Sequence, residues 1–236
     1  MTQGDGLFET LKVVDGVPFA LTRHLARLQS SAQALGLEGC VEAQVRDAVR
    51  QALAGAGSEP LRMRVLWGSG GVEVELTPLP PVAPSTAVRT SRWRRNEQSA
   101  VRGHKTNAYA ENLVALAEAT QEGCTESLLA DTRGMLSEGT GTNVFYVVDG
   151  ELRTPSLATG CLPGVTRALV LEWCGAVEVD EPIAVLERAT EVFLTSSTRD
   201  VQAVHQLDGR RLSAPGPLTR EVQETWRERV RTTPDP

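Results

Sequence analysis

Lys105 is the residue of this sequence with the clearest capacity for covalent chemistry. It is one of only two lysines, with Lys12, in a chain that is rich in arginine. A lysine amine can lose its proton when buried and attack a carbonyl carbon, whereas an arginine guanidinium stays protonated. A lysine chosen at random is far more often a solvated surface residue. A chemical role for Lys105, in His-Lys-Thr-Asn-Ala-Tyr, therefore depends on its neighbours.

Two segments have the chemistry to hold a phosphate group. In Leu-Pro-Gly-Val-Thr, ending at Thr166, a Pro-Gly turn precedes a predicted helix whose first N–H groups are free to bind an anion. In residues 195–198, Thr-Ser-Ser-Thr, four hydroxyls follow a short predicted strand and could bind phosphate or a substrate carboxylate. An ordinary capped helix and a polar turn are the alternatives.

Two charged residues complete the set of candidates. Glu138 lies in a Gly-rich loop, Ser-Glu-Gly-Thr-Gly-Thr-Asn, that leads into a predicted strand. A carboxylate at a rigid site can keep a pyridine ring protonated and so make the ring an electron sink. Arg27, in His-Leu-Ala-Arg-Leu, could grip a phosphate with two parallel hydrogen bonds. A solvated turn glutamate and a surface helix arginine are the alternatives.

The first part of the chain is predicted to be a small α+β unit. Asp15-Gly16 is a typical tight turn between two pairing strands, and Thr22 is a plausible N-cap for the next helix. The predicted elements are strands over 7–14 and 17–20, helices from 22 to about 39 and over 41–54, and strands over 61–67 and 72–77.

Residues 78–85 contain four prolines and are the best candidate for a linker between domains. The expected division is therefore a small N-terminal domain over 1–80 and a large domain over 81–236. In the large domain we predict strands over 87–92, 127–131, 143–148, 151–154, 192–195 and 201–207, and helices over 109–121, 165–174 and 219–230.

Composition excludes several classes of partner. A net charge of −6 gives no electrostatic reason to expect nucleic acid or an anionic membrane. The short basic cluster at Arg92, Arg94 and Arg95 fits a surface loop as well as a binding site. The four cysteines form no Cys-x-x-Cys pair, so we expect reduced thiols and no metal site. Without a signal peptide or a spanning apolar run, the cytoplasm is the expected location.

Taken together, the segments resemble the class IV, or fold type IV, PLP-dependent aminotransferases. That group includes branched-chain and D-amino-acid aminotransferases, R-selective amine transaminases and aminodeoxychorismate lyases. The matching segments, in order, are Gly4-Asp5-Gly6-Leu7-Phe8-Glu9-Thr10, His24-Leu25-Ala26-Arg27-Leu28, Lys105, Glu138-Gly139 through Asn143-Val144-Phe145, Leu162-Pro163-Gly164-Val165-Thr166-Arg167, and the hydroxyl run before Arg199.

The resemblance implies a role for each matching position. Lys105 would carry pyridoxal 5′-phosphate as a Schiff base and then move protons, and Glu138 would bind the pyridine nitrogen. The implied phosphate-binding residues are Arg27, Val165, Thr166, Ser196 and Ser197. Tyr109 corresponds to a tyrosine that binds the cofactor's phenolic oxygen in some members. The implied substrate-binding residues are Arg64, Thr198 and Arg199.

The resemblance also implies the architecture. We expect an α/β (α+β) chain of two domains, with the cofactor between a small α/β domain and a larger domain with a barrel-like sheet, and a homodimer. Family members usually have about two strands before Gly-Asp-Gly, whereas Met1-Thr2-Gln3 leads directly into that segment here. Either the start is mis-assigned or the small domain is clipped at its N-terminus. The sequence also contains no Arg-x-His segment of the D-amino-acid type.

Three functions remain open from the sequence. The expected one is transfer of an amino group between amino and keto acids. The same cofactor and lysine would also serve an aminodeoxychorismate lyase, which releases 4-aminobenzoate and pyruvate by β-elimination. A non-catalytic binding module on the same fold is a remote alternative. A nucleotide-binding α/β protein is disfavoured because neither G-x-G-x-x-G nor a P-loop is present.

Overall fold

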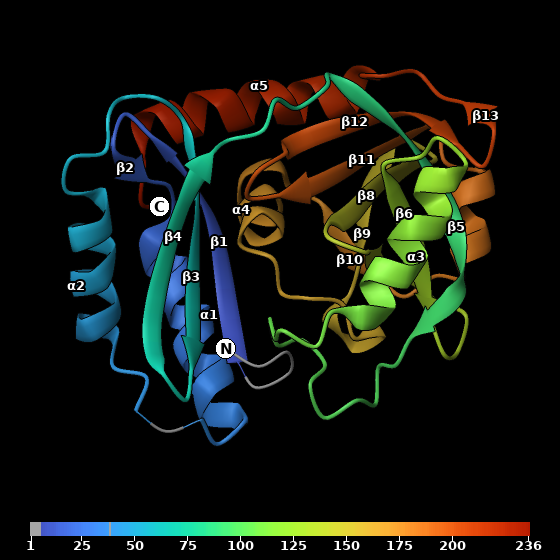
Figure 1. The fold of residues 1–236 in the computed structure, drawn as a ribbon. Helices are drawn as coiled ribbons and strands as arrows, with labels where there is room; N and C mark the ends of the chain where they lie inside the picture. Colours follow the sequence, from blue (N-terminus) through green and yellow to red (C-terminus); the bar gives the residue numbers. More distant parts are fainter. Residues whose placement is uncertain (1–5, 38) are drawn as a thin grey trace. The chain divides into compact units, whose positions relative to one another are not determined.

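The computed structural model describes residues 6–37 and 39–236 and contains two compact units (Figure 1). Unit 1 runs through Pro81 and also takes in His104–Ala108 and Arg229–Pro236, and unit 2 consists of Val82–Gly103 and Tyr109–Glu228. Lys105 therefore lies in unit 1. The expected mixed α/β class is confirmed, while the domain division at residue 80 stays a prediction. No described helix is long and apolar enough to span a membrane.

Unit 1 is a four-stranded antiparallel sheet with two helices. The strands are β1 (Gly6–Val14), β2 (Val17–Pro18), β3 (Leu61–Gly68) and β4 (Gly71–Pro78), in the order β2-β1-β3-β4. Helices α1 (Leu21–Ala34) and α2 (Glu42–Leu53) pack against β1 and β4. Alternate side chains of β1 and β3, such as Leu11 and Val65, join the apolar core beneath the helices.

The predicted N-cap of α1 is wrong. The cap residue is Ala20, in the left-handed region at φ 54°, and its side chain makes no capping bond. The C-terminal segment supplies the cap instead. Asp235 Oδ1 accepts from Thr22 N (2.9 Å), Asp235 Oδ2 accepts from Thr22 Oγ1 (2.6 Å), and Pro234 O accepts from Ala20 N (2.7 Å). The helix also ends earlier than expected, at Ala34 rather than near Gly39.

The core of unit 1 contains a buried ionic cluster. Glu9, on β1, is 1% exposed and pairs with two residues of α1. Its Oε1 accepts from Arg27 Nε (2.8 Å), and its Oε2 accepts from Arg27 Nη2 (2.6 Å) and lies 2.7 Å from His24 Nδ1. Burial alone would raise the pKa of Glu9, but the charge and hydrogen bonds of Arg27 and His24 hold it at about 2.

Unit 2 is built on a mixed nine-stranded sheet in the order β10-β9-β8-β11-β12-β5-β6-β7, with β13 paired to β12. The strands are β5 (Ser85–Arg95), β6 (Glu126–Asp131), β7 (Leu136–Gly139), β8 (Asn143–Val148), β9 (Glu151–Pro155), β10 (Val177–Val179), β11 (Glu191–Ser196), β12 (Asp200–Leu207) and β13 (Arg210–Arg211). The helices are α3 (Ala110–Gln121), α4 (Val165–Cys174) and α5 (Pro217–Thr232), with 3-10 turns at Leu157–Thr159 and Ile183–Glu187. The last turn of α5 belongs to unit 1.

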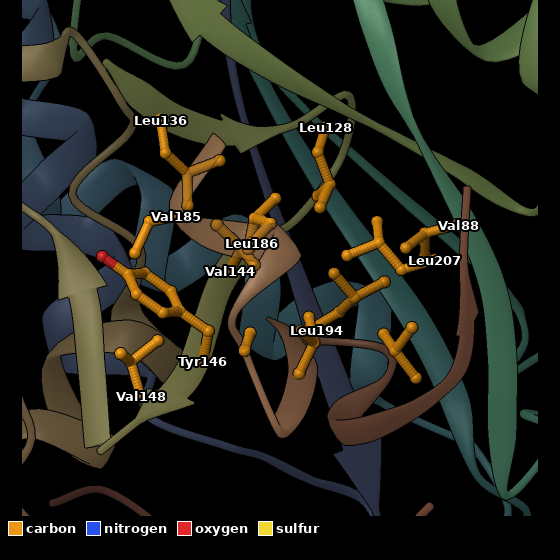
Figure 2. Close-up of a cluster of buried hydrophobic side chains, with 13 residues drawn as sticks. Val88, Leu128, Leu136, Val144, Tyr146, Val148, Val185, Leu186, Leu194 and Leu207 are labelled. Atoms are coloured by element: carbon orange, nitrogen blue, oxygen red, sulfur yellow. The ribbon is translucent and has the colours of Figure 1, made fainter. Parts of the chain in front are cut away.

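One face of this sheet carries the apolar core of unit 2, with branched side chains around Tyr146 (Figure 2). The buried residues are Val88, Leu128, Leu136, Val144, Tyr146, Val148, Val185, Leu186, Ala189, Val192, Leu194, Val204 and Leu207. Helix α4 packs against β11, and Trp173 of α4 contacts Trp226 of α5, with ring centroids 5.3 Å apart. The apolar core thus takes up the side chains on one face of the sheet. Side chains at the alternate strand positions point to the other face, where the helices pack.

Two expectations about the site change with this fold. Strand β7 was not predicted, and it places Glu138 on a strand opposite Leu129 rather than in a loop. The Arg92–Arg95 cluster is the end of β5, which extends three residues past its predicted end. Arg92 and Arg94 are exposed there, whereas Arg95 is half-buried. Both differences arise because pairing with β6 forms strand structure at residues where the local sequence does not predict it.

We expect Asp235→Asn to weaken α1 because the neutral amide loses charge-assisted acceptance at the helix N-terminus. The free energy of unfolding should fall by about 1 kcal/mol. Urea titration followed by circular dichroism measures the change. Glu59→Gln, which removes an exposed negative charge elsewhere in unit 1, is the matched control. Equal stability of wild type and Asp235→Asn would show that the tail does not cap α1.

The Glu9 cluster should make stability depend on pH. The folded-state pKa of Glu9, about 2, lies below the ordinary value of 4.5. The unfolded chain therefore binds the proton more readily, so this stabilisation is present above about pH 5 and is lost as the pH falls toward 2. Glu9→Gln should cost roughly 3 kcal/mol at neutral pH and flatten the profile below about pH 5. Glu73→Gln, which removes an exposed carboxylate of β4, is the control. If the two variants lose stability in parallel as the pH falls, this prediction is refuted.

Candidate functional site

Lys105 is held in unit 1 by backbone pairing with a strand nearly a hundred residues earlier in the sequence. Phe8 N donates to Lys105 O (3.0 Å), Asn107 N donates to Gly6 O (2.9 Å), and Leu7 and Thr106 form a β-bridge. The side chain of Lys105 is half-buried, and its Nζ lies 4.4 Å from the centroid of the Phe8 ring. The amine therefore has a defined position on β1.

Arg64 shares the Phe8 ring with this amine. The guanidinium carbon of Arg64, on β3, lies 5.1 Å from the ring centroid, and Nη1 lies 3.8 Å from Glu75 Oε2. Arg64 is thus placed near Lys105, as a substrate-binding residue would have to be. Its substrate role stays a prediction.

Arg27 faces the helix side of the same sheet, where Glu9 fixes its guanidinium through two hydrogen bonds. Burial is the main reason that the pKa of His24 is lowered, and the charges of Arg27 and Lys105 lower it further. The negative charge of Glu9 therefore balances the permanent positive charge of Arg27. The expected phosphate role of Arg27 stays a prediction.

Glu138 is 8% exposed, and its carboxylate contacts Arg95 and the Leu162 backbone in unit 2. Its Oε1 lies 3.1 Å from Arg95 Nε, and its Oε2 accepts from Leu162 N (2.9 Å). Asn143 Nδ2 in turn donates to Leu162 O (2.9 Å). The carboxylate is thus fixed between the arginine and the segment that leads into α4.

The start of α4 has the form of an anion site. Its cap residue is Gly164, which has no side chain with which to cap the first N–H groups. A Cβ at Gly164 would overlap the Asn143 side chain, so only glycine allows this close approach. Val165 and Thr166 are buried in the first turn. The positive end of the helix dipole and the N–H donors of the first turn fit a phosphate.

The hydroxyl run begins with the last two residues of β11, the strand on which α4 packs, and continues into the turn that follows. Thr195 Oγ1 is buried and has no hydrogen-bond partner among the described residues. A buried hydroxyl without a partner is unusual and suits a bound acceptor. Ser196 Oγ accepts from Arg199 N (3.2 Å), and Ser197 and Thr198 are half-buried in the turn that follows. The chain therefore offers phosphate donors from two adjacent elements.

Tyr109 precedes α3 and donates its hydroxyl proton to Thr140 O (2.7 Å). Burial, and next the negative charge of Glu138, raise the pKa of Tyr109 to about 12. The phenol therefore stays protonated at neutral pH. Arg199 contacts protein groups, namely Gln202 Oε1 (3.2 Å) and Thr125 O (3.2 Å). Its substrate role, like that of Thr198, stays a prediction.

The structure thus gathers the candidates into two sets. Unit 1 brings together Lys105, Arg64 and, across the sheet, Arg27. Unit 2 positions the remaining candidates, Tyr109, Glu138, Val165, Thr166, Ser196, Ser197, Thr198 and Arg199.

Sequence reasoning missed the partners of these residues. Arg95 was grouped with its exposed neighbours, and no signal identified Glu9 or Glu126 as buried. Arg92, Trp93 and Arg94 are exposed in succession before Arg95, so no regular alternation in the sequence separates Arg95 from its neighbours. Gly4 and Asp5 of the first matching segment lie outside the described residues.

Comparison with known proteins agrees with the resemblance. Residues 6–207 match the family described as amino-transferase class IV. D-alanine aminotransferase of Bacillus licheniformis is 28% identical over 253 residues, which cover 93% of this chain and 86% of that protein. The branched-chain aminotransferase of Thermoproteus uzoniensis, solved with norvaline, superposes with a TM-score of 0.89 at 26% identity, covering 96% of this chain and 85% of that one.

A third relative has a structure with the cofactor. A hypothetical aminotransferase from Mycobacterium tuberculosis, solved in a PLP-bound form, superposes with a TM-score of 0.85 at 25% identity, covering 95% of this chain and 88% of that one. The match extends over most of the chain and over all the motifs within the described residues. The chain belongs to the class IV aminotransferases, a family of PLP-dependent enzymes.

Proposed function

We propose that this enzyme transfers amino groups between amino acids and 2-oxo acids, with Lys105 as the residue that binds pyridoxal phosphate covalently and carries protons. The observation that carries the proposal is the pairing of residues 105–107 with β1, which gives a scarce lysine a fixed amine beside Phe8. A surface lysine without such pairing would not hold a reacting atom in place.

The residues of unit 2 fit the rest of the cofactor. The N–H groups of Val165 and Thr166 and the hydroxyls of Ser196 and Ser197 would bind the phosphate, and the unpartnered Thr195 hydroxyl supports this assignment. Arg27 would add a positive charge. Glu138 would bind the ring nitrogen as a carboxylate, steadied by Arg95. When bound, the cofactor supplies an electron sink for the bond broken at the substrate Cα.

Each candidate residue would then have a defined role in the reaction. Lys105, as a neutral amine, would act as general base and take the proton from the substrate Cα. It would then act as general acid and give the proton up on the same side of the substrate. Glu138 keeps a proton at the ring nitrogen by offering it an anionic acceptor. Tyr109 would lie at the phenolic oxygen, with its hydroxyl held in place by Thr140 O. Arg64, Thr198 and Arg199 would bind the substrate carboxylate. The resemblance further suggests a homodimer.

We expect borohydride reduction of the PLP-treated protein to attach the cofactor to Lys105 alone. Because the chain has only one other lysine, Lys12, Lys12→Arg is a complete control. Lys105→Ala should lose the reducible linkage and the visible absorption band, and its turnover should fall at least about 100-fold. Mass mapping of the reduced peptides checks this. Labelling of Lys12, or of the Lys105→Ala chain, would contradict the assignment.

Glu138→Gln should lower turnover by roughly 100-fold or more, since a neutral amide cannot hold the proton at the ring nitrogen. The assay is a panel of amino donors with 2-oxo acid acceptors. Glu187→Gln, on an exposed turn of unit 2, should keep the activity of the wild type.

Pyruvate release from aminodeoxychorismate, run beside this panel, separates the two reactions. Amino transfer without pyruvate release supports the proposal. Pyruvate release without amino transfer would replace it with the lyase.

A further inference from the structure

Glu126, at the start of β6, is a buried carboxylate whose described partners are all neutral donors. It is 1% exposed. Its Oε1 accepts from Thr140 N (2.8 Å), Ser127 N (3.0 Å) and, at short range, Thr140 Oγ1. Its Oε2 accepts from Gly141 N (3.2 Å) and Thr142 Oγ1 (3.0 Å). Four of these five bonds come from the turn Thr140-Gly141-Thr142.

This turn directly follows Glu138 and is closely packed on the carboxylate. Gly139 N donates to Thr142 O (2.7 Å), which closes the turn. A Cβ at Gly139 would overlap Thr142 Oγ1 and the Glu126 carboxyl group, so no larger residue fits. The position of Thr140 is therefore set by Glu126 rather than by the turn alone.

Thr140 connects Glu126 to the groups that we assign to the cofactor ring. Its carbonyl accepts from Tyr109 Oη (2.7 Å) and from Asn112 Nδ2 (2.5 Å). Asn112 Oδ1 accepts from Arg95 Nη1 (3.2 Å), and Arg95 Nε lies 3.1 Å from Glu138 Oε1. A continuous set of contacts thus runs from Glu126 to Tyr109 and, through Arg95, to Glu138.

We infer that Glu126 is a positioning residue for the cofactor ring, because it fixes the carbonyl that orients both Tyr109 and the Arg95–Glu138 pair. The inference rests on the proposed function. Only an acceptor can satisfy five donors, and a carboxylate has no N–H of its own. A glutamine here would turn an amide group toward N–H and O–H donors and displace Thr140.

Glu191 provides a matched control. It is also buried in unit 2, and it accepts from Leu218 N (3.2 Å), Thr219 N (2.8 Å) and Thr219 Oγ1 (2.7 Å). A Cβ at Gly216 would overlap its carboxyl group, just as one at Gly139 would overlap Glu126. Its described bonds cap α5 and do not lead to Tyr109 or Glu138. Loss of either carboxylate should therefore destabilise the fold, but only loss of Glu126 should change the binding and the visible band of the cofactor.

The experiment compares the full-length wild type, Glu126→Gln and Glu191→Gln, each loaded with pyridoxal phosphate. Both variants should melt about 5 °C lower. Glu126→Gln alone should weaken cofactor binding about 5-fold or more. It alone should also shift the pH midpoint of the visible band by about half a unit or more, since the groups around the ring move. Glu126→Asp, which keeps the charge, should recover part of that shift.

Three results would overturn the inference. A Glu126→Gln protein with the wild-type band and pH midpoint would show that Glu126 has only a structural role. The same conclusion follows if both Glu126 variants fail to fold while Glu191→Gln folds. A wild type that takes up no pyridoxal phosphate overturns the proposed function itself, and the inference falls with it. The colour of the wild type therefore separates the two failures.

Discussion

A carboxylate removed from water must be matched by donors or cations, and this constraint organises both units of the enzyme. Glu9 is matched by Arg27 and His24, so it joins β1 to α1. Glu138 is matched by Arg95 and a backbone N–H, and Glu126 by a turn of the chain. In each case the contact joins segments that lie apart in the sequence. The proposed site would therefore rest on the same contacts that stabilise each unit.

The two units carry different groups of candidate site residues. Unit 1 carries Lys105 and Arg64, whose side chains both lie over the Phe8 ring. Unit 2 presents an anionic partner, Glu138, together with an uncapped helix start and a buried hydroxyl at Thr195. The motifs that match the family are thus spread over both units and over most of the sequence.

Local signals in the sequence identified most of the elements and the candidate residues. Asp15-Gly16 formed the expected turn, because the conformation of a tight turn depends on a few neighbouring residues. The resemblance supplied the roles of Lys105 and Glu138, which no local pattern could assign. Neither the strand that carries Glu138 nor the place of Lys105 in unit 1 was predicted, because both depend on pairing between segments far apart in the chain. The partners Glu9, Arg95 and Glu126 were missed for the same reason.

The discontinuity of unit 1 has a consequence for synthesis on the ribosome. Its sheet and helices emerge first, but the β-bridge at Thr106 requires residues made later, and the cap of α1 requires Pro234 and Asp235. Domains usually fold in the order in which they are translated. Here unit 2, whose strands lie between these pieces, can assemble while unit 1 is still incomplete. The lysine-bearing part of the enzyme therefore reaches its final form only after translation has passed the C-terminal helix.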